Sequence, residues 1–307
     1  MSYSARMQKN HLYSVFLAPR GYVRMADLGM QIAQQYLSPF DKLIGLVGDA
    51  GSGKSMLVKG MFPGLELTND DEGVNVRPLP LMDLGDDSGF YSPHTYHVDI
   101  RFETAFHQPH VLIEAILEAI DRGKRVVVEH FDLIYPALGR NAHLLIGIGE
   151  EVIITRPSLF GPEPEELRER VFPSLPYRLR AHTAEDLCEY VMNGNCPRYE
   201  HADVRHGFIL SFESKPAFSP PELMEKVQKL IDADLPISFL DDNHIRIGDT
   251  PHRCTGPRMH VKRTKEIGRF LLLEDFYPEP ITERCLMVGL VGEGCDYKSS
   301  DINRLIF

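Results

Sequence analysis

The chain has 307 residues and a mass of 34.9 kDa, with 43% hydrophobic and 25% charged residues. This composition is typical of a soluble globular protein, and the length predicts two domains that each bury a core. The 33 basic and 44 acidic residues give a net charge of −11, which argues against nonspecific binding to nucleic-acid phosphates. No apolar run approaches the roughly 20 residues that span a bilayer, and the first residues lack a signal-peptide pattern. We therefore expect a cytoplasmic protein without a membrane partner, whose five cysteines are free thiols with at most one metal ligand among them.

The first 40 residues are expected to form a packing segment ahead of the first domain's sheet. Residues 19–40 predict a helix, because apolar side chains recur at helical spacing on one face: Met25, Leu28, Ile32 and Tyr36. The next apolar run, Leu43–Val47, predicts a short buried strand.

Residues 48–55 read GDAGSGKS and match the phosphate-binding pattern GxxxxGK[ST] at every fixed position. The pattern stands between a predicted strand and residues that can start a helix, which is the context in which it binds phosphates. Its glycines let backbone N–H groups converge on phosphate oxygens, while Lys54 neutralises the β- and γ-phosphates and the Ser55 hydroxyl binds Mg²⁺. We therefore expect ATP and Mg²⁺ as cofactors, held by Gly48, Asp49, Ala50, Gly51, Ser52, Gly53, Lys54 and Ser55.

The segments that follow the loop alternate between strand and helix patterns. Residues 74–82 are a candidate strand whose two prolines favour an edge position or an irregular segment, and residues 111–120 have helical periodicity. Three further apolar runs predict buried strands: residues 125–128, 144–148 and 151–155. This order predicts an α/β P-loop NTPase domain over residues 1–177, with a mostly parallel sheet and helices on both faces.

Residues 96–132, YHVDIRFETAFHQPHVLIEAILEAIDRGKRVVVEHFD, resemble the substrate region of the uridine kinase and phosphoribulokinase family. The resemblance implies that Asp83, which follows the candidate strand, is the catalytic base on an acceptor hydroxyl and acts with Lys54. It also implies an acceptor pocket that contains His97, Asp99 and Arg101. A carboxylate in this role orients the attacking hydroxyl for in-line phosphoryl transfer. Asp83 in its glycine-containing loop equally fits a solvated turn.

Two features near this region leave alternatives open. The family closes an arginine-rich lid over the phosphates, whereas the stretch after Thr155 is rich in proline and offers its arginines at another spacing: Arg156, Arg168 and Arg170. Glu129 and Asp132 follow a predicted strand and either hold Mg²⁺ through water or are ordinary loop residues.

The second half of the chain has a different pattern of elements. Residues 206–213 predict a strand, and Ser219 is a helix N-cap followed by prolines and by Glu222 at the third helical position. That helix should extend to about residue 232. Further strands are predicted at His244–Ile247 and at residues 269–273.

This order over residues 178–292 resembles the second additional domain, or editing domain, of threonyl- and alanyl-tRNA synthetases. CTGPRMHVKRTKEIGRF at residues 254–270 resembles the family's CxGxHVxxTxEIxxF segment, and AHTAEDL at residues 181–187 resembles its HSAAHLL helix. The resemblance implies an α+β domain over residues 178–307 and an editing function that acts on tRNA.

In that family an HxxxH helix and a Cys/His loop form a metal site. The corresponding residues here depart from the pattern, because the second helical histidine is replaced by an aspartate and the Cys-to-His gap is five residues in place of three: His182, Asp186, Cys254 and His260. They form either a mixed Zn²⁺ site, since zinc accepts carboxylate ligands, or a structural hydrogen-bond cluster. His201 and His206 are interpreted as turn and strand-edge residues.

Residues 253–269 hold six basic residues and one acidic residue, for a local charge of +5. Such a stretch either meets the acceptor end of tRNA or is a solvated basic loop.

The function that these patterns favour is Mg-ATP-dependent phosphoryl transfer to a small hydroxyl acceptor such as a nucleoside, by a P-loop kinase or ATPase. One alternative is a tRNA-editing-type aminoacyl ester hydrolase with a regulatory P-loop. The other is a non-catalytic, ATP-gated binding module.

Overall fold

The computed structural model describes residues 12–68, 79–82 and 94–304 and divides the chain into two compact units. Unit 1 comprises residues 1–16 and 25–173, and unit 2 comprises residues 17–24 and 174–307. The sequence predicts a boundary after residue 177, whereas the units divide after Pro173, within helix α7 (Pro164–Met192). Residues 17–24 belong to unit 2, where Arg20 bonds to Glu185 and to backbone carbonyl groups.

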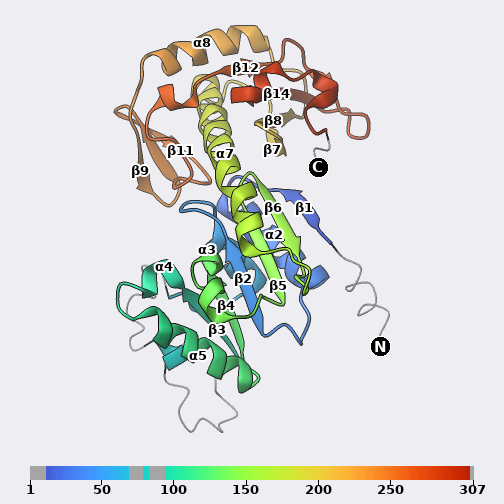
Figure 1. Cartoon of the computed structure of the whole chain (residues 1–307). Coiled ribbons are helices and arrows are strands. Elements are labelled where there is room, and N and C mark those ends of the chain that lie inside the picture. The colour runs from blue at the N-terminus through green and yellow to red at the C-terminus, as the bar shows by residue number, and fades with distance from the viewer. Residues whose placement is uncertain (1–11, 69–78, 83–93, 305–307) are drawn as a thin grey trace. The chain divides into compact units, whose positions relative to one another are not determined.

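Unit 1 contains a six-stranded sheet with the order β1-β6-β5-β2-β4-β3 (Figure 1). The strands are β1 Ser14–Leu17, β2 Leu43–Val47, β3 Thr95–Asp99, β4 Arg125–Glu129, β5 Leu144–Ile148 and β6 Glu151–Thr155. Strands β3, β4, β2 and β5 are parallel to their neighbours, and β6 is antiparallel to β5. The two residues between β5 and β6 suffice for a hairpin but not for a parallel crossover. The predicted mostly parallel sheet is confirmed.

Both faces of the central strand β2 are buried, as the predicted layers require. Leu43 and Val47 belong to one core cluster, together with Leu112 of α5 (Pro109–Asp121). Helix α5 packs against β4 (Figure 1). Ile44 and Leu46 point to the other face and are also fully buried. The helices whose residues lie in unit 1 wholly or in part are α2 Tyr22–Tyr36, α3 Lys54–Met61, α4 Ile100–Glu103, α5 Pro109–Asp121, α6 Tyr135–Leu138 and the start of α7.

Helices α2 and α3 approach each other closely through two glycines. A Cβ atom added to Gly60 would lie 2.0 Å from the carbonyl oxygen of Ala26, and one added to Gly29 would lie 2.3 Å from that of Leu57. The two helix backbones can therefore approach this closely only with glycine at positions 29 and 60.

The predicted apolar face of α2 is buried at Met25, Leu28 and Ile32.

The last three residues of the candidate strand at residues 74–82 are not a strand. Pro80–Met82 form the 3₁₀-helix η2, which fits the irregular alternative, and Pro80 has no N–H to donate to a strand ladder. Residues 69–78 lie outside the described part of the chain.

Unit 2 is an α+β unit with two antiparallel sheets (Figure 1). The larger sheet has the order β12-β14-β8-β7, with β13 paired to β14, and the smaller sheet has the order β11-β10-β9. The elements are the rest of α7, β7 Tyr199–Val204, β8 Gly207–Phe212, α8 Pro220–Asp232, β9 Ile237–Asp241, β10 His244–Ile247, β11 Thr250–Arg253, β12 Phe270–Leu272, β13 Tyr277–Pro278 and β14 Cys285–Val291. A single core joins α7, α8 and both sheets.

The start of α8 confirms the predicted capping. The Ser219 hydroxyl accepts a hydrogen bond from the Glu222 backbone N–H, and the Glu222 carboxylate accepts one from the Ser219 N–H. This reciprocal pair satisfies two N–H groups that a helix start otherwise leaves without partners. The apolar face of α8 is buried through Leu223, Val227 and Ile231.

Candidate functional sites

The loop between β2 and α3 has the backbone conformation that its glycines make accessible. Gly51 and Gly53 have φ values of 76° and 89°, in the left-handed region that side chains rarely adopt. A Cβ atom at Gly48 would lie 2.7 Å from the Ile148 carbonyl oxygen and 2.8 Å from Ser52 Oγ. Each of the fixed glycines in the phosphate-binding pattern therefore has a local structural reason.

The side chain of Lys54 bonds to the backbone of this loop. Its Nζ donates to the carbonyl oxygens of Gly48 and Asp49, at 3.0 Å each, and the residue is 5% exposed. Burial lowers the pKa of Lys54, while the carboxylates of Glu129 and Asp99 oppose that shift. The ammonium group is thus held next to the loop backbone, in the position from which it can approach a phosphate.

A hydrogen-bonded chain connects Ser55 to the end of β4. The Ser55 hydroxyl and the His97 Nε2 both bond to the buried carboxylate of Glu129, the latter at 3.1 Å from Oε1. The Nδ1 of His97 accepts from the Thr68 backbone N–H at 3.1 Å, so its Nε2 carries the hydrogen. Burial would raise the pKa of Glu129, but His97 and Lys54 overcome this and hold it below its usual range. Glu129 is therefore an ionised carboxylate beside the loop's hydroxyl.

His130 is a residue of this region that the sequence did not single out. It has φ of 58° and is 4% exposed, immediately after Glu129. Burial and then the nearby Lys54 lower its pKa to about 4. A neutral imidazole with a left-handed backbone beside the loop is a strained arrangement of the kind found at functional sites.

The residues assigned to an acceptor pocket each have contacts within the protein. His97 uses both ring nitrogens inside the protein, and Asp99 caps α4 by accepting from the Phe102 N–H at 3.1 Å. Arg101 is half exposed and lies 3.4 Å from the carboxylate of Asp49 in the phosphate loop. Asp83 lies outside the described residues.

The three arginines considered for a lid each form ion pairs in unit 1. Arg156 donates to both carboxylate oxygens of Asp41, at 2.7 and 2.8 Å. Arg168 lies 3.5 Å from Asp132, and Arg170 lies 3.6 Å from the carboxylate of Glu151. Burial raises the pKa of Asp132. Arg156 therefore has a structural role, and Arg168, although half exposed, also bonds to Glu165 at 3.0 Å.

In unit 2 the fold brings together the four residues that the synthetase resemblance selects. His182 and Asp186 lie one helical turn apart on α7, and Cys254 and His260 lie on the segment after β11. One donor atom from each lies within 4.8 Å of all the others. Three of the four residues line a cavity of about 610 Å³.

The distances within this cluster fit a tetrahedral metal. Cys254 Sγ lies 3.4 Å from His182 Nε2 and 3.6 Å from His260 Nε2. A tetrahedral zinc ion with its usual bond lengths separates neighbouring ligand atoms by about 3.3–3.6 Å. His260 Nε2 and Asp186 Oδ2 are 2.6 Å apart, a direct hydrogen bond that would open around an ion. Two imidazoles, one thiol and one carboxylate are donors that zinc accepts.

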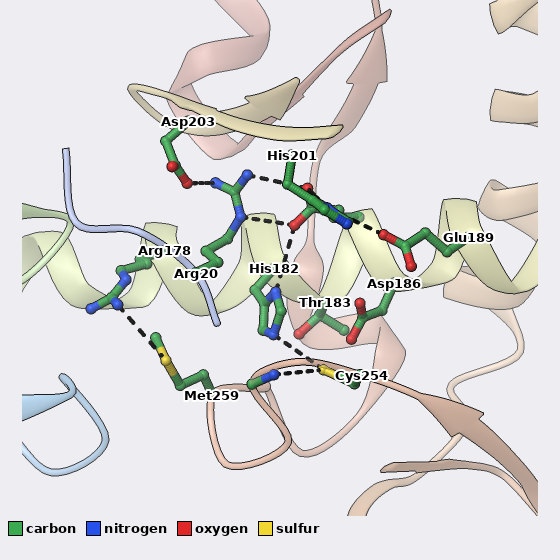
Figure 2. A network of polar contacts seen from close by, with 12 residues as sticks. Arg20, Arg178, His182, Thr183, Asp186, Glu189, His201, Asp203, Cys254 and Met259 are labelled. Carbon is green, nitrogen blue, oxygen red and sulfur yellow. Dashed lines mark hydrogen bonds and ion pairs between the residues drawn. The ribbon is translucent and has the colours of Figure 1, made fainter. Parts of the chain in front are cut away.

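A buried ion pair lies beside this cluster (Figure 2). Arg20 Nε donates to Glu185 Oε2 at 2.9 Å, with both side chains at most 4% exposed. Arg20 also donates to the carbonyl oxygens of Gly207 and Ala202 and pairs with Asp203. Burial would raise the pKa of Glu185, but Arg20 and neighbouring histidines hold it well below its usual range.

Glu185 also links the two histidines on either side of it. Its carboxylate lies 3.1 Å from His201 Nδ1 and 3.6 Å from His182 Nδ1 (Figure 2). His206 lies in the turn between β7 and β8 with φ of 54°, outside β8 and not in the strand predicted for residues 206–213, whereas His201 lies within β7 and lines the cavity. The sequence showed no sign of this role for His201, since its contact with Glu185 depends on how β7 packs against α7.

A further acid lines the cavity. Glu189 lies one turn after Glu185 on α7, and burial followed by the charge of Asp186 raises its pKa to about 8. Burial, followed by the effect of Glu189, also raises the pKa of Tyr199. His252 of β11 lines the same cavity, and burial lowers the pKa of its imidazole.

The basic stretch at residues 253–269 carries less unpaired charge than the sequence indicates. Arg263 pairs with Asp234 at 2.9 Å, and Arg269 pairs with Asp296 at 2.7 Å. Arg258 lies over the ring of Phe239. Two of the six basic side chains are therefore neutralised by acids from outside the stretch.

No protein-family model matches the chain, and no curated protein matches its sequence. Within the described part of the chain, no helix combines the length and the apolar character that a bilayer crossing requires. The function must therefore be inferred from the residues of the two sites and their geometry.

Proposed function

We propose that unit 1 is a P-loop nucleotide-binding unit that binds Mg-ATP and transfers its terminal phosphoryl group to a small hydroxyl acceptor such as a nucleoside. The observation that carries this proposal is the loop itself. Left-handed Gly51 and Gly53 shape it, Lys54 is held against its backbone, and the Ser55 hydroxyl bonds to the ionised Glu129. This is the set of groups that phosphate and Mg²⁺ binding require.

Each residue would have a distinct part in binding. Backbone N–H groups of the loop and of the first turn of α3 would receive the phosphates, and Lys54 would exchange its bonds to loop carbonyls for phosphate oxygens. Ser55 and Glu129 would hold Mg²⁺, which neutralises the charge that develops on the phosphates. His97 fixes the orientation of Glu129. We propose Asp83 as the general base that accepts the proton of the acceptor hydroxyl.

The test is ATP binding, measured by calorimetry, in the intact chain and in Lys54→Ala and Ser55→Ala. Removal of the lysine deletes a charge-assisted hydrogen bond to phosphate, so affinity should fall by about 10–100-fold. Lys59→Ala is the matched control, because Lys59 lies on the exposed face of the same helix.

Turnover is measured on the same samples with pooled nucleosides. A phosphorylated nucleoside supports the transferase, whereas tight ATP binding without turnover in any condition supports an ATP-gated binding module. Unchanged ATP affinity and turnover in Lys54→Ala would refute a nucleotide site at this loop.

A second candidate function follows from unit 2. We propose that His182, Asp186, Cys254 and His260 bind Zn²⁺ and that the adjoining cavity hydrolyses an aminoacyl ester on tRNA. The supporting observation is the convergence of the four donors at tetrahedral distances on a cavity of about 610 Å³. Bound zinc lowers the pKa of a coordinated water and polarises carbonyl groups.

This candidate predicts zinc in protein prepared without chelators, and its loss in Cys254→Ser. Cys295→Ser is the matched control, since Cys295 lies on the 3₁₀-helix η5 (Gly292–Asp296) and outside the described metal-ligand groups. It also predicts tRNA binding that weakens steeply as salt is raised. Metal-free protein that binds no tRNA would refute it.

A further inference from the structure

Two atoms in the wall of the unit 2 cavity lack hydrogen-bond partners. Glu189 Oε1 and His252 Nε2 are inaccessible to solvent, and neither forms a hydrogen bond among the described residues. His201 Nδ1 is 3.5 Å from Glu189 Oε1, but it lies closer to Glu185, at 3.1 Å, and bonds there. A buried carboxylate oxygen and a buried imidazole nitrogen without partners are costly unless something else satisfies them.

These two side chains converge with Asp186. Donor atoms of Asp186, Glu189 and His252 all lie within 4.8 Å of one another. Asp186 and Glu189 are three residues apart on α7, so they share a helix face, and His252 reaches the same point from β11. The ring of Tyr190 meets the His252 ring edge-on, with centroids 5.8 Å apart, and restricts its orientation.

The neighbouring set of Glu185, Glu189 and His201 is a weaker candidate. Its donor atoms also lie close together, but Glu185 is already paired with Arg20 and bonded to His201. A cation there would face a buried guanidinium group. Asp186 and Glu189 have no such arginine or lysine partner among the described ion pairs. Asp186 contacts His260 and Cys254, and Glu189 contacts His201 and the Tyr199 side chain.

We propose that Asp186, Glu189 and His252 bind a second divalent cation, so that unit 2 holds a two-metal centre in which Asp186 is shared with the four-residue cluster. A carboxylate has two oxygens and can bridge two ions, which in two-metal sites lie about 3.5–4 Å apart. Two carboxylates and one imidazole suit zinc, manganese or iron(II). The proposal rests on the proposed zinc site, because Asp186 belongs to both.

Because only three protein groups hold the second ion, its remaining positions would be open to the cavity. That arrangement is typical of a catalytic metal and not of a structural one, which is closed by four ligands. Two adjacent ions in the cavity would stabilise the attacking and the leaving oxygen atoms during hydrolysis of an ester.

The experiment measures zinc stoichiometry. The intact chain is stripped with a chelator, dialysed against Zn²⁺ and analysed for metal and protein, alongside Glu189→Gln and His252→Gln. We expect two ions per chain in the parent and one in each variant, since loss of a ligand should weaken the second site by at least about 100-fold. Cobalt(II) loading should retain the thiolate-to-metal absorption of the Cys254 site in both variants.

Two controls change the same residue types at positions that do not line the cavity. His244→Gln changes a histidine of β10, in the same small sheet as His252, and Glu225→Gln changes a helical glutamate on α8. Both should keep two ions. One ion in the parent would overturn the second site while leaving the zinc proposal intact, and two ions in both variants would also overturn it. No bound metal in the parent would overturn both proposals.

Discussion

Replacement of Arg20 with methionine should destabilise unit 2 more than any exposed substitution. The guanidinium group is 4% exposed and bonds to Glu185, to two backbone carbonyl oxygens and to Asp203. Methionine keeps much of the apolar volume but removes the charge and all of these bonds. Asp203 retains Arg24 as an ion-pair partner, so the main loss falls on Glu185.

The expected loss of unfolding free energy follows from the contacts that Glu185 retains without Arg20. Its side chain is 3% exposed, and without Arg20 its remaining contacts are His201 at 3.1 Å and His182 at 3.6 Å. Breaking a buried pair by removal of one partner costs about 3–5 kcal/mol, because an uncompensated charge remains in the interior. In a domain of this size, that corresponds to a midpoint lower by about 6–20 °C.

The assay is thermal and urea unfolding of the intact chain, followed by circular dichroism. Arg246→Met is the matched control, since Arg246 is exposed on β10 and should change the free energy of unfolding by at most about 0.5 kcal/mol. Addition of Glu185→Leu to Arg20→Met should recover most of the loss, because the pair is then replaced by apolar groups.

A loss below about 1 kcal/mol in Arg20→Met would refute the reasoning, since that is the value of an exposed pair. Failure of the double variant to recover stability would show that the backbone carbonyl bonds, and not the buried charge, dominate.

Three further predictions concern stability. Gly60→Ala should cost about 1–3 kcal/mol in urea unfolding, because its Cβ atom would lie 2.0 Å from the Ala26 carbonyl oxygen and force α2 and α3 apart. Ser219→Ala should cost about 1 kcal/mol in the same assay, by removing the N-cap of α8. Because the folded-state pKa of Glu185 lies well below its unfolded value, its ion pair stabilises the protein above about pH 4. That contribution should be lost as the pH falls through the folded pKa, and Arg20→Met should weaken this acid-side dependence in a pH series of unfolding midpoints.

Each of these predictions has a result that would contradict it. An unchanged unfolding midpoint in Gly60→Ala would mean that the two helices are not held in close contact. A loss in Ser219→Ala no larger than that in Glu225→Gln, on the exposed face of the same helix, would exclude a stabilising cap. An identical pH dependence with and without Arg20 would show that its charge does not set the pKa of Glu185.

The conformation of the glycine-rich loop could be predicted from the sequence because its determinants are contiguous. Eight consecutive residues between an apolar strand and a helix contain the glycines that the observed φ values require and the lysine that bonds back to the loop. The same holds for the capping box of α8 and for β2, β5 and β6, whose short apolar runs each predicted one strand with its observed bounds. Such features depend on neighbours within a few residues.

The four-residue cluster of unit 2 was selected through resemblance, and its spacing alone did not determine whether the donors meet. His182 and Cys254 are 72 residues apart, and only the packing of α7 against the segment after β11 brings their atoms to 3.4 Å. The departures from the family pattern are accommodated because the longer Cys-to-His segment still returns His260 to Asp186.

The sequence by itself thus determined the local elements, the glycine-rich loop and the mostly parallel sheet, because periodicity and short motifs report interactions between near neighbours. Only the tertiary structure decided that Arg20 neutralises Glu185 across 165 residues and that Glu189 and His252 face the same cavity as the zinc-ligand candidates. Contacts between single polar side chains at such separations have no repeating pattern along the chain. Their partners are set by how the sheets of unit 2 pack on α7.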